Sequence, residues 1–231
     1  MKTRRNTALV VAAGGGSRFG GKLPKQFADL SGKPMIVYCL ELFERCNLID
    51  EVILVVAEDY LVYASQEIVD RFRLKKINKL TTGGESRQES VLAGLSACLP
   101  GADLVVIHDA VRPLLAMDLL RKTIEKAAET GGAILAVPSK ESVKMVEGGS
   151  IVRTLIRDTV WTAQTPQAFR FEKILEAHRR AEAAGNEATD DSELYEQYCG
   201  QVSVVHGSYN NIKITTRGDL ILAAELLKGA V

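Results

Sequence analysis

The chain has 231 residues, of which 46% are hydrophobic and 25% charged, with 19 Gly and 6 Pro. This composition is typical of folded globular proteins and excludes disordered and collagen-like classes. Its 29 Lys and Arg residues balance 29 Asp and Glu residues, so the formal net charge is +0. General nucleic-acid binders and anionic-membrane binders need a sustained positive field, so we expect neither partner, and any charge-driven site must be local.

Cysteine usage and the N-terminus indicate the cellular compartment. The four cysteines form no CxxC pair and have no histidine at ligand spacing, which disfavours a zinc site or a disulfide framework. The first eleven residues lack the apolar core of a signal peptide, and no run approaches the ~18 apolar residues of a membrane span. We therefore expect a cytoplasmic protein with buried, reduced thiols.

Short apolar runs alternate with segments of helical periodicity along most of the chain. The runs predict strands at 9–13, 52–57, 104–107, 133–137, 202–205 and 212–215. The periodicity predicts helices at 34–45, 60–73, 86–99, 118–130 and 171–184, and Thr216 to Asp219 looks like the capped start of a last helix covering one side of the sheet. This alternation predicts an α/β fold with a Rossmann-like, doubly wound, mostly parallel sheet.

One segment interrupts the alternation. Short β-like runs at 142–146 and 151–155 flank Gly148-Gly149, a dipeptide suited to a tight hairpin turn. We predict a protruding β-hairpin arm at about 139–157 on a single domain that spans 1–231. An isolated hairpin is marginal in water, so the arm should pack on its own body or on another subunit. The large apolar ring of Trp161, just beyond it, is expected in the core.

A glycine-rich loop, Gly14-Gly15-Gly16-Ser17-Arg18, follows the first strand, where open α/β sheets bind ligands. It fails the dinucleotide pattern because Phe19 replaces the third Gly, and it fails the phosphate-loop pattern because Leu23 replaces the hydroxyl residue. An NAD-dependent dehydrogenase and an ATPase are therefore disfavoured.

The charges around this loop point to phosphate chemistry. Between Met1 and Ala28 the chain has no acid and six basic residues: Lys2, Arg4, Arg5, Arg18, Lys22 and Lys25. Fixed cations beside glycines suit nucleotidyl transfer, in which negative charge develops on phosphates. The alternative for the loop alone is a surface turn with solvated lysines.

Several motifs together resemble one enzyme family. The first stretch, Ala12 to Arg18 followed by Pro24-Lys25-Gln26, resembles the signature of sugar nucleotidyltransferases. Further stretches narrow the resemblance to the 2-C-methyl-D-erythritol 4-phosphate cytidylyltransferases of isoprenoid biosynthesis, over nearly the whole chain. These stretches are Gly83-Gly84-Glu85-Ser86-Arg87-Gln88-Glu89-Ser90-Val91, Val106-Ile107-His108-Asp109-Ala110-Val111-Arg112-Pro113, Thr165-Pro166-Gln167, Thr189-Asp190-Asp191 and Asn211-Ile212-Lys213-Ile214-Thr215.

The resemblance implies roles for particular residues. CTP would be held by Ala12, Ala13, Gly14 and Gly16, its cytosine by Gly84 and Ser90, and its ribose or a magnesium ion by Asp109. Arg18 and Lys25 would stabilise the transition state. The polyol phosphate would be bound by Ser142, Arg157, Thr165 and Lys213, of which Arg157 and Lys213 orient it for attack. The family forms dimers, so a homodimer with arm exchange would combine Arg18, Lys25 and Lys213 of one chain with Ser142 and Arg157 of the other.

The implied reaction joins CTP and a polyol phosphate and needs no protein nucleophile, because the acceptor phosphate, with a second pKa of about 6, supplies one. Mg²⁺ or another divalent cation is the expected cofactor. Ser142 stands where better-known members have Thr, which preserves the hydroxyl. Ribitol 5-phosphate cytidylyltransferases share the loop and the arm, so ribitol 5-phosphate is an alternative acceptor. A non-catalytic nucleotide-binding module is an alternative function of a different class. His108 and the Asp190-Asp191 pair are interpreted as structural, the aspartates as a helix start.

Overall fold

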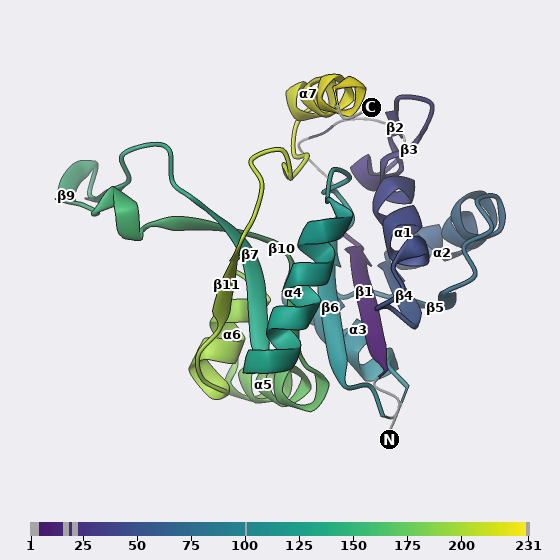
Figure 1. Cartoon of the computed structure of the whole chain (residues 1–231), viewed down its shortest axis with the longest axis horizontal. Helices are drawn as coiled ribbons and strands as arrows, with labels where there is room; N and C mark the ends of the chain where they lie inside the picture. Colours follow the sequence, from purple (N-terminus) through teal and green to yellow (C-terminus); the bar gives the residue numbers. More distant parts are fainter. Residues whose placement is uncertain (1–4, 16–18, 20–22, 100, 230–231) are drawn as a thin grey trace.

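A computed structural model describes residues 5–15, 19, 23–99 and 101–229 (Figure 1). Its central sheet has seven strands in the order β11-β7-β10-β6-β1-β4-β5. They are β1 (Asn6–Ala12), β4 (Glu51–Val56), β5 (Ile77–Thr82), β6 (Leu104–Asp109), β7 (Gly132–Pro138), β10 (Trp161–Arg170) and β11 (Ser203–His206). β10 runs antiparallel to β6 and β7, and the other pairings of this sheet are parallel. The predicted mostly parallel α/β sheet is confirmed.

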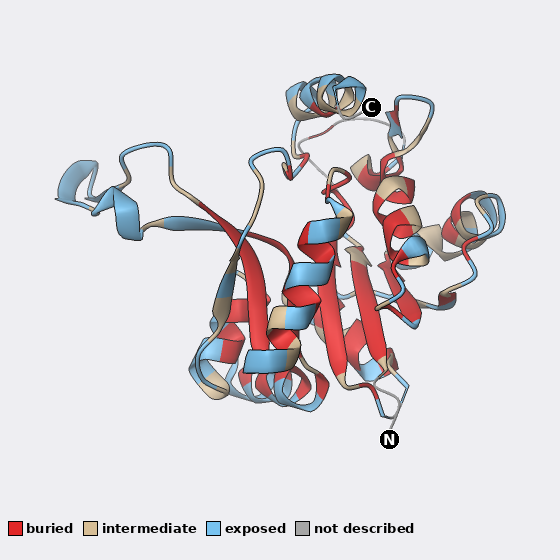
Figure 2. Ribbon diagram, in the orientation of Figure 1, coloured by how far each residue is buried: buried red, intermediate tan, exposed pale blue. Residues whose placement is uncertain are grey.

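Helices cover both faces because side chains alternate along each strand. Ala8 and Val10 of β1 join the cluster under α1 (Met35–Arg45) and α4 (Met117–Thr130), whereas Leu9 joins the cluster under α3 (Arg87–Ala97), α5 (Phe171–Ala184) and α6 (Asp191–Tyr198). Gly94 of α3 lies so close to Leu9 that a Cβ there would collide with the leucine side chain. Figure 2 shows the resulting buried strands between exposed outer helix faces.

The segment predicted as one helix at 60–73 is composite. It consists of the 3₁₀ turn η2 (Glu58–Tyr60), a single turn α2 (Leu61–Tyr63) and the π-helical η3 (Ala64–Asp70). Short 3₁₀ turns also form η1 (Lys25–Phe27) and η4 (Arg157–Thr159), and β2 (Asp29–Leu30) pairs with β3 (Lys33–Pro34).

The arm is a hairpin of β8 (Lys144–Glu147) and β9 (Ser150–Thr154) that projects away from the body (Figure 1). Gly148 and Gly149 turn it with φ angles of 54° and 80°, both in the left-handed region that favours glycine. The hairpin predicted from the sequence is confirmed, and it carries exposed apolar side chains.

Two sequence predictions about the C-terminal part are wrong. Residues 212–215 form no strand: Ile214 is fully buried, but its N–H donates to Val111 O at 2.9 Å outside any sheet. The last helix, α7 (Arg217–Lys228), has the predicted capping box of Thr216 and Asp219, yet it does not cover a sheet face. Ala223 instead packs with Phe19, Leu30, Met35, Val111 and Ile214 beyond the strand ends, near β2 and β3 (Figure 1).

Trp161 and two of the cysteines lie nearer the surface than expected. Trp161 is 40% exposed, and its ring meets His206 edge to face, because it starts β10 where the sheet leads into the arm. The four thiols are free, with Cys39 and Cys46 buried and Cys98 and Cys199 half-buried. A search of the described ranges for a bilayer-spanning helix, one both long and apolar enough, finds none.

Candidate active site

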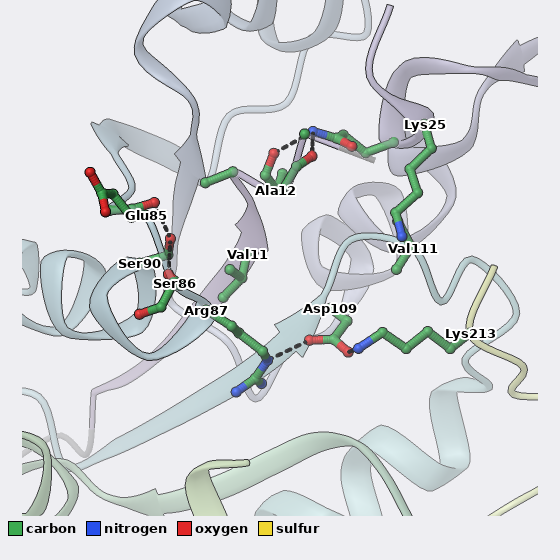
Figure 3. A pocket seen from close by; sticks show the side chains of 15 residues that line it. Val11, Ala12, Lys25, Glu85, Ser86, Arg87, Ser90, Asp109, Val111 and Lys213 are labelled. Carbon is green, nitrogen blue, oxygen red and sulfur yellow. Dashed lines mark hydrogen bonds and ion pairs between the residues drawn. The ribbon is translucent and has the colours of Figure 1, made fainter. Parts of the chain in front are cut away.

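A cavity of about 230 Å³ opens at the carboxyl ends of β1 and β6 (Figure 3). Parallel strands end together there, and free backbone N–H groups of the following loops can face a ligand. It is lined by Val11, Ala12, Ala13, Gly14, Gly15, Lys25, Gln26, Gly84, Glu85, Ser86, Arg87, Ser90, Asp109, Val111 and Lys213. Three cations and two carboxylates among these residues leave a surplus of positive charge, which suits a phosphorylated ligand.

Two loops that form the cavity are held tightly against each other. The Gln26 amide donates to Ala12 O at 2.5 Å and to Gly14 O at 3.3 Å, so η1 fixes the start of the glycine loop. A Cβ at Gly83 would collide with Ala13 Cβ and with Ser90 Oγ, so only glycine permits this approach of the second loop. The described backbone groups of these two loops are therefore preorganised for a nucleotide.

Asp109, the last residue of β6, lies at the centre of the charged groups. Its carboxylate accepts from Arg87 Nε at 3.1 Å and contacts Lys213 Nζ at 2.8 Å, and these side chains approach it from opposite sides (Figure 3). Arg112 Nε lies 4.0 Å away. Burial alone would raise the pKa of Asp109, but Arg87 and Lys213 hold it well below its ordinary value. The carboxylate is therefore ionised whenever the protein is folded near neutral pH.

Behind Asp109, His108 and Thr165 form a fixed hydrogen-bonded pair. Burial lowers the pKa of His108 to about 4, so its ring is neutral at pH 7. Its Nε2 lies 3.1 Å from Arg112 O, which can only accept, so Nε2 carries the proton and Nδ1 accepts from the Thr165 hydroxyl at 3.0 Å. Thr165 Oγ1 in turn accepts from the Asp109 N–H at 3.1 Å. His108 therefore makes the contacts expected of a structural residue.

A second cavity, of about 240 Å³, shares a wall with the first. It is lined by Arg87, Asp109, Arg112, Ala163, Gln164, Thr165, Gln167, Thr189, Asp190 and Lys213. Arg87, Asp109 and Lys213 therefore belong to both cavities. Two ligands bound side by side would meet at these three side chains.

The predicted site residues fall into three groups. The first cavity gathers Ala12, Ala13, Gly14, Lys25, Gly84, Ser90, Asp109 and Lys213, and the second adds Thr165. Gly16 and Arg18 lie outside the described residues.

The third group, Ser142 and Arg157, lines neither cavity. Ser142 is exposed at the base of the arm, and the Arg157 side chain is 62% exposed with Asp158 at 3.9 Å. The fold of one chain does not bring these two residues to the pocket, because β8, β9 and η4 project from the body.

Sequence reasoning gave no role to Gln26 or Arg87, although it quoted both within motifs. A signal for Arg87 was present: it opens α3, where the helix dipole disfavours a cation. Asp190 and Asp191 begin α6 as predicted, with the Asp190 carboxylate accepting from Glu193 N–H at 3.0 Å.

The donor set fits a magnesium ion held largely by a triphosphate. The described residues contain no group of three or more His, Cys, Asp or Glu side chains that could hold a metal. Mg²⁺ in nucleotide sites is commonly bound through one or two carboxylates together with substrate phosphates and water. Ionised Asp109 could be such a ligand, although Arg87 and Lys213 already contact it.

Comparison with known proteins agrees with this geometry. The sequence profile of the family IspD, 2-C-methyl-D-erythritol 4-phosphate cytidylyltransferase, matches residues 7–229. The chain belongs to this family. Its members include the 2-C-methyl-D-erythritol 4-phosphate cytidylyltransferases of Geobacter metallireducens, 42% identical over 96% of this chain and 97% of the relative, and of Alkaliphilus oremlandii, 37% identical over 97% and 95%.

Solved structures of IspD proteins share the fold. The crystal structure of 4-diphosphocytidyl-2C-methyl-D-erythritol synthase from Anaerococcus prevotii has a TM-score of 0.86 and 32% identity, covering 97% of this chain and 96% of that one. The Francisella tularensis IspD structure has a TM-score of 0.79 and 30% identity, covering 95% of this chain and 98% of that one. The fold and family expected from the sequence motifs are both confirmed.

Proposed function

We propose that this chain transfers the cytidylyl group of CTP to 2-C-methyl-D-erythritol 4-phosphate, as IspD enzymes of the non-mevalonate isoprenoid pathway do. The products are 4-diphosphocytidyl-2-C-methyl-D-erythritol and pyrophosphate. The observation that carries the proposal is the pair of adjoining cavities sharing Arg87, Asp109 and Lys213, in a chain that matches the family over residues 7–229. One cavity suits the nucleotide and the other the acceptor.

The residues support a direct in-line transfer. An oxygen of the acceptor phosphate, largely dianionic at pH 7, forms a bond to the α-phosphorus of CTP while the bond to the β-phosphate bridging oxygen breaks. The electron pair leaves with pyrophosphate, so the chain needs no base. Lys25 and Arg18 would stabilise charge on the triphosphate, and Lys213 would bring the acceptor dianion close despite the repulsion between phosphates.

Magnesium dependence is part of the proposal. The ion, when bound to the triphosphate, would neutralise part of its charge and ease approach of the acceptor. Asp109 is the side chain that we assign to it, beside the phosphate oxygens. Activity should disappear with excess EDTA and return with Mg²⁺; full activity in EDTA would refute this part.

We also propose a cytoplasmic homodimer in which each arm reaches the pocket of the other chain. All residues of β8 and β9 are exposed, including the apolar side chains Met145, Val146, Ile151 and Val152 at 45–64%. Burying such a patch is the usual reason for association. Ile151→Glu should yield monomers in sedimentation, and Glu147→Lys, which keeps the apolar side chains, should stay dimeric; a dimeric Ile151→Glu protein would argue against the arm interface.

The decisive experiment measures pyrophosphate release with each nucleoside triphosphate against methylerythritol phosphate and ribitol 5-phosphate. We expect turnover with CTP and methylerythritol phosphate. Turnover with ribitol 5-phosphate alone would identify ribitol 5-phosphate as the acceptor, and the reaction would still be cytidylyl transfer. CTP binding without turnover on either acceptor would instead favour a non-catalytic nucleotide-binding module.

A further inference from the structure

Arg87 occupies a position that its own helix disfavours. It is the first residue of α3, and the N-terminal end of a helix carries partial positive charge. Two carboxylates compensate: Arg87 Nε donates to Asp109 Oδ1 at 3.1 Å, and Nη2 donates to Asp191 Oδ2 at 2.8 Å. These acceptors lie 22 and 104 residues away in the sequence. Only the tertiary fold brings the three groups together.

Arg87 lies between two buried carboxylates and compensates the charge of both. The Asp109 and Asp191 side chains are only 8% and 1% exposed. Burial alone would lower the pKa of Arg87, but Asp191 and Asp109 raise it above its ordinary value. Burial alone would likewise raise the pKa of Asp191, but Arg87 and His178 lower it. A planar guanidinium can donate to two carboxylates from a rigid fork, which a lysine ammonium cannot reproduce.

The two carboxylates belong to different parts of the site. Asp109 lines both cavities, whereas Asp191 directly follows Thr189 and Asp190, which line the second cavity. On the side away from Arg87, buried His178 approaches Asp191 Oδ1 through Nε2 at 3.2 Å. Arg87 thus ties the start of α6 to the end of β6.

Gln88 makes a second link from the same helical turn to the same segment. Its amide donates to Asn186 O at 2.9 Å and accepts from Ala188 N–H at 3.0 Å. Gln88 lines neither cavity. It therefore holds residues 186–188 without contacting Asp109, and it provides a natural control for Arg87.

We propose that Arg87 is a positioning residue that couples the two cavities, so that a nucleotide in the first strengthens binding of the polyol phosphate in the second. The inference rests on the proposed function, which supplies the two ligands. Arg87 and Lys213 share the Asp109 carboxylate. A ribose hydroxyl of the nucleotide, or a metal ion bound to it, would engage Asp109, weaken its pair with Lys213 and free that ammonium for the acceptor phosphate. Arg87 would meanwhile keep Asp109 and the 186–191 segment in place.

Calorimetry of the full-length protein tests this coupling. The dissociation constant of methylerythritol phosphate is measured with and without the non-reactive analogue cytidine α,β-methylene triphosphate and magnesium. The wild-type affinity should rise at least about fivefold with the analogue, within the usual range of coupling between sites. Arg87→Lys, which keeps the charge and loses the fork, should reduce that ratio to within about twofold of one.

Two further variants distinguish coupling between the two cavities from a general loosening of the 186–191 segment. Gln88→Ala should weaken methylerythritol phosphate equally with and without the analogue, so its ratio should match the wild type. Asp191→Asn keeps the side-chain shape and removes the charge beyond Arg87, so its ratio should fall as in Arg87→Lys. If Arg87→Lys fails to fold, Asp191→Asn decides the question.

A wild-type ratio near one, or an unchanged ratio in folded Arg87→Lys or Asp191→Asn, would overturn the inference. Turnover of CTP with methylerythritol phosphate is measured on the same wild-type preparation. Absence of turnover with either acceptor would count against the proposed function, whereas normal turnover with unchanged coupling would count against the role of Arg87 alone.

Discussion

Asp109, at the end of β6, is 6% exposed and differs sharply from the arm, where every residue of β8 and β9 is exposed. Cations from α3, from the loop after β6 and from the segment before α7 lie within 4.0 Å of Asp109. The first region is fixed by contacts within one chain. The second has its shape from a glycine turn and one strand pair, with little packing around it.

Under the proposed dimer, this difference divides the site into a part that folding of one chain completes and a part that assembly completes. Variants at the pocket end should change chemistry or binding in any chain that folds. Variants on the arm should act only through the subunit that receives the arm. The predictions below test that division, beginning with the largest effect.

Lys25→Ala should have the largest effect. Lys25 lines the first cavity from η1. Removing a hydrogen-bond donor that stabilises negative charge in the transition state should lower kcat by about 100-fold or more. Arg18→Ala, in the undescribed part of the glycine loop, should behave alike. Pyrophosphate release at saturating substrates measures both. Lys122→Ala on α4, whose side chain is 61% exposed, is the control and should be unchanged; near-normal turnover in Lys25→Ala would mean that the loop is only structural.

Lys213→Ala should act mainly on the acceptor. A charge-assisted hydrogen bond contributes about 1.5–3 kcal/mol, so KM for methylerythritol phosphate should rise about tenfold to a hundredfold while CTP affinity does not fall. Arg157→Ala, on the arm, should also raise KM for methylerythritol phosphate without lowering CTP affinity. Lys228→Ala, with a 69% exposed side chain, serves as control. Loss of CTP binding with intact acceptor binding in either variant would contradict our division of the pocket.

Subunit mixing tests the division directly. At methylerythritol phosphate concentrations below the wild-type KM, Lys25→Ala and Arg157→Ala homodimers should each keep only a small fraction of wild-type activity. A mixed dimer has one site with both lesions and one with none. Random exchange makes half of the dimers mixed, so about a quarter of wild-type activity should return. Mixing Lys25→Ala with Lys213→Ala is the control, because both lesions lie in the body and no intact site can form. Failure of the first mixture to regain activity would show that each site is built within one chain.

Sequence patterns predicted the parts of the fold that local periodicity encodes. The alternation of apolar runs and helical spacing indicated the parallel core, and Gly148-Gly149 indicated the hairpin. β10 was missed because Trp161 to Arg170 is rich in polar residues and contains Pro166, and its pairing with β6 and β7 is long-range. The run at 212–215 looked like a strand because Ile214 is apolar, but its burial comes from packing near α7.

The candidate site was predictable as a set of motifs but not as a network. Lys25, Asp109 and Lys213 stand in recognisable stretches, and the structure places all three at one cavity. Arg87 stands in such a stretch too, yet its meaning depends on Asp191, 104 residues away. No local pattern encodes that distance.

The smallest predicted effect concerns the segment that carries Lys213 into α7. The Asp219 carboxylate accepts from the N–H groups of Thr215 and Thr216, each at 2.8 Å, and from the Thr215 hydroxyl at 2.8 Å. The hydrogen bond from the Thr215 backbone is the main cause that lowers the pKa of Asp219 to about 2. The cap should therefore contribute fully above the unfolded-state pKa of about 3.9 and fade as pH falls toward 2.

Asp219→Asn should lower the free energy of unfolding by about 1 kcal/mol at pH 7, the usual contribution of a helix cap. Urea unfolding of both proteins at pH 7, 4 and 2.5 measures the difference, which should shrink as the wild-type carboxylate takes up its proton. Glu129→Gln, on the exposed face of α4, should stay within about 0.5 kcal/mol of wild type throughout. A difference for Asp219→Asn that persists undiminished to pH 2.5 would show that the cap acts through shape and hydrogen bonding of the neutral group. The stability of the cap at the start of α7 would then not depend on charge, in contrast to the charged groups around Asp109.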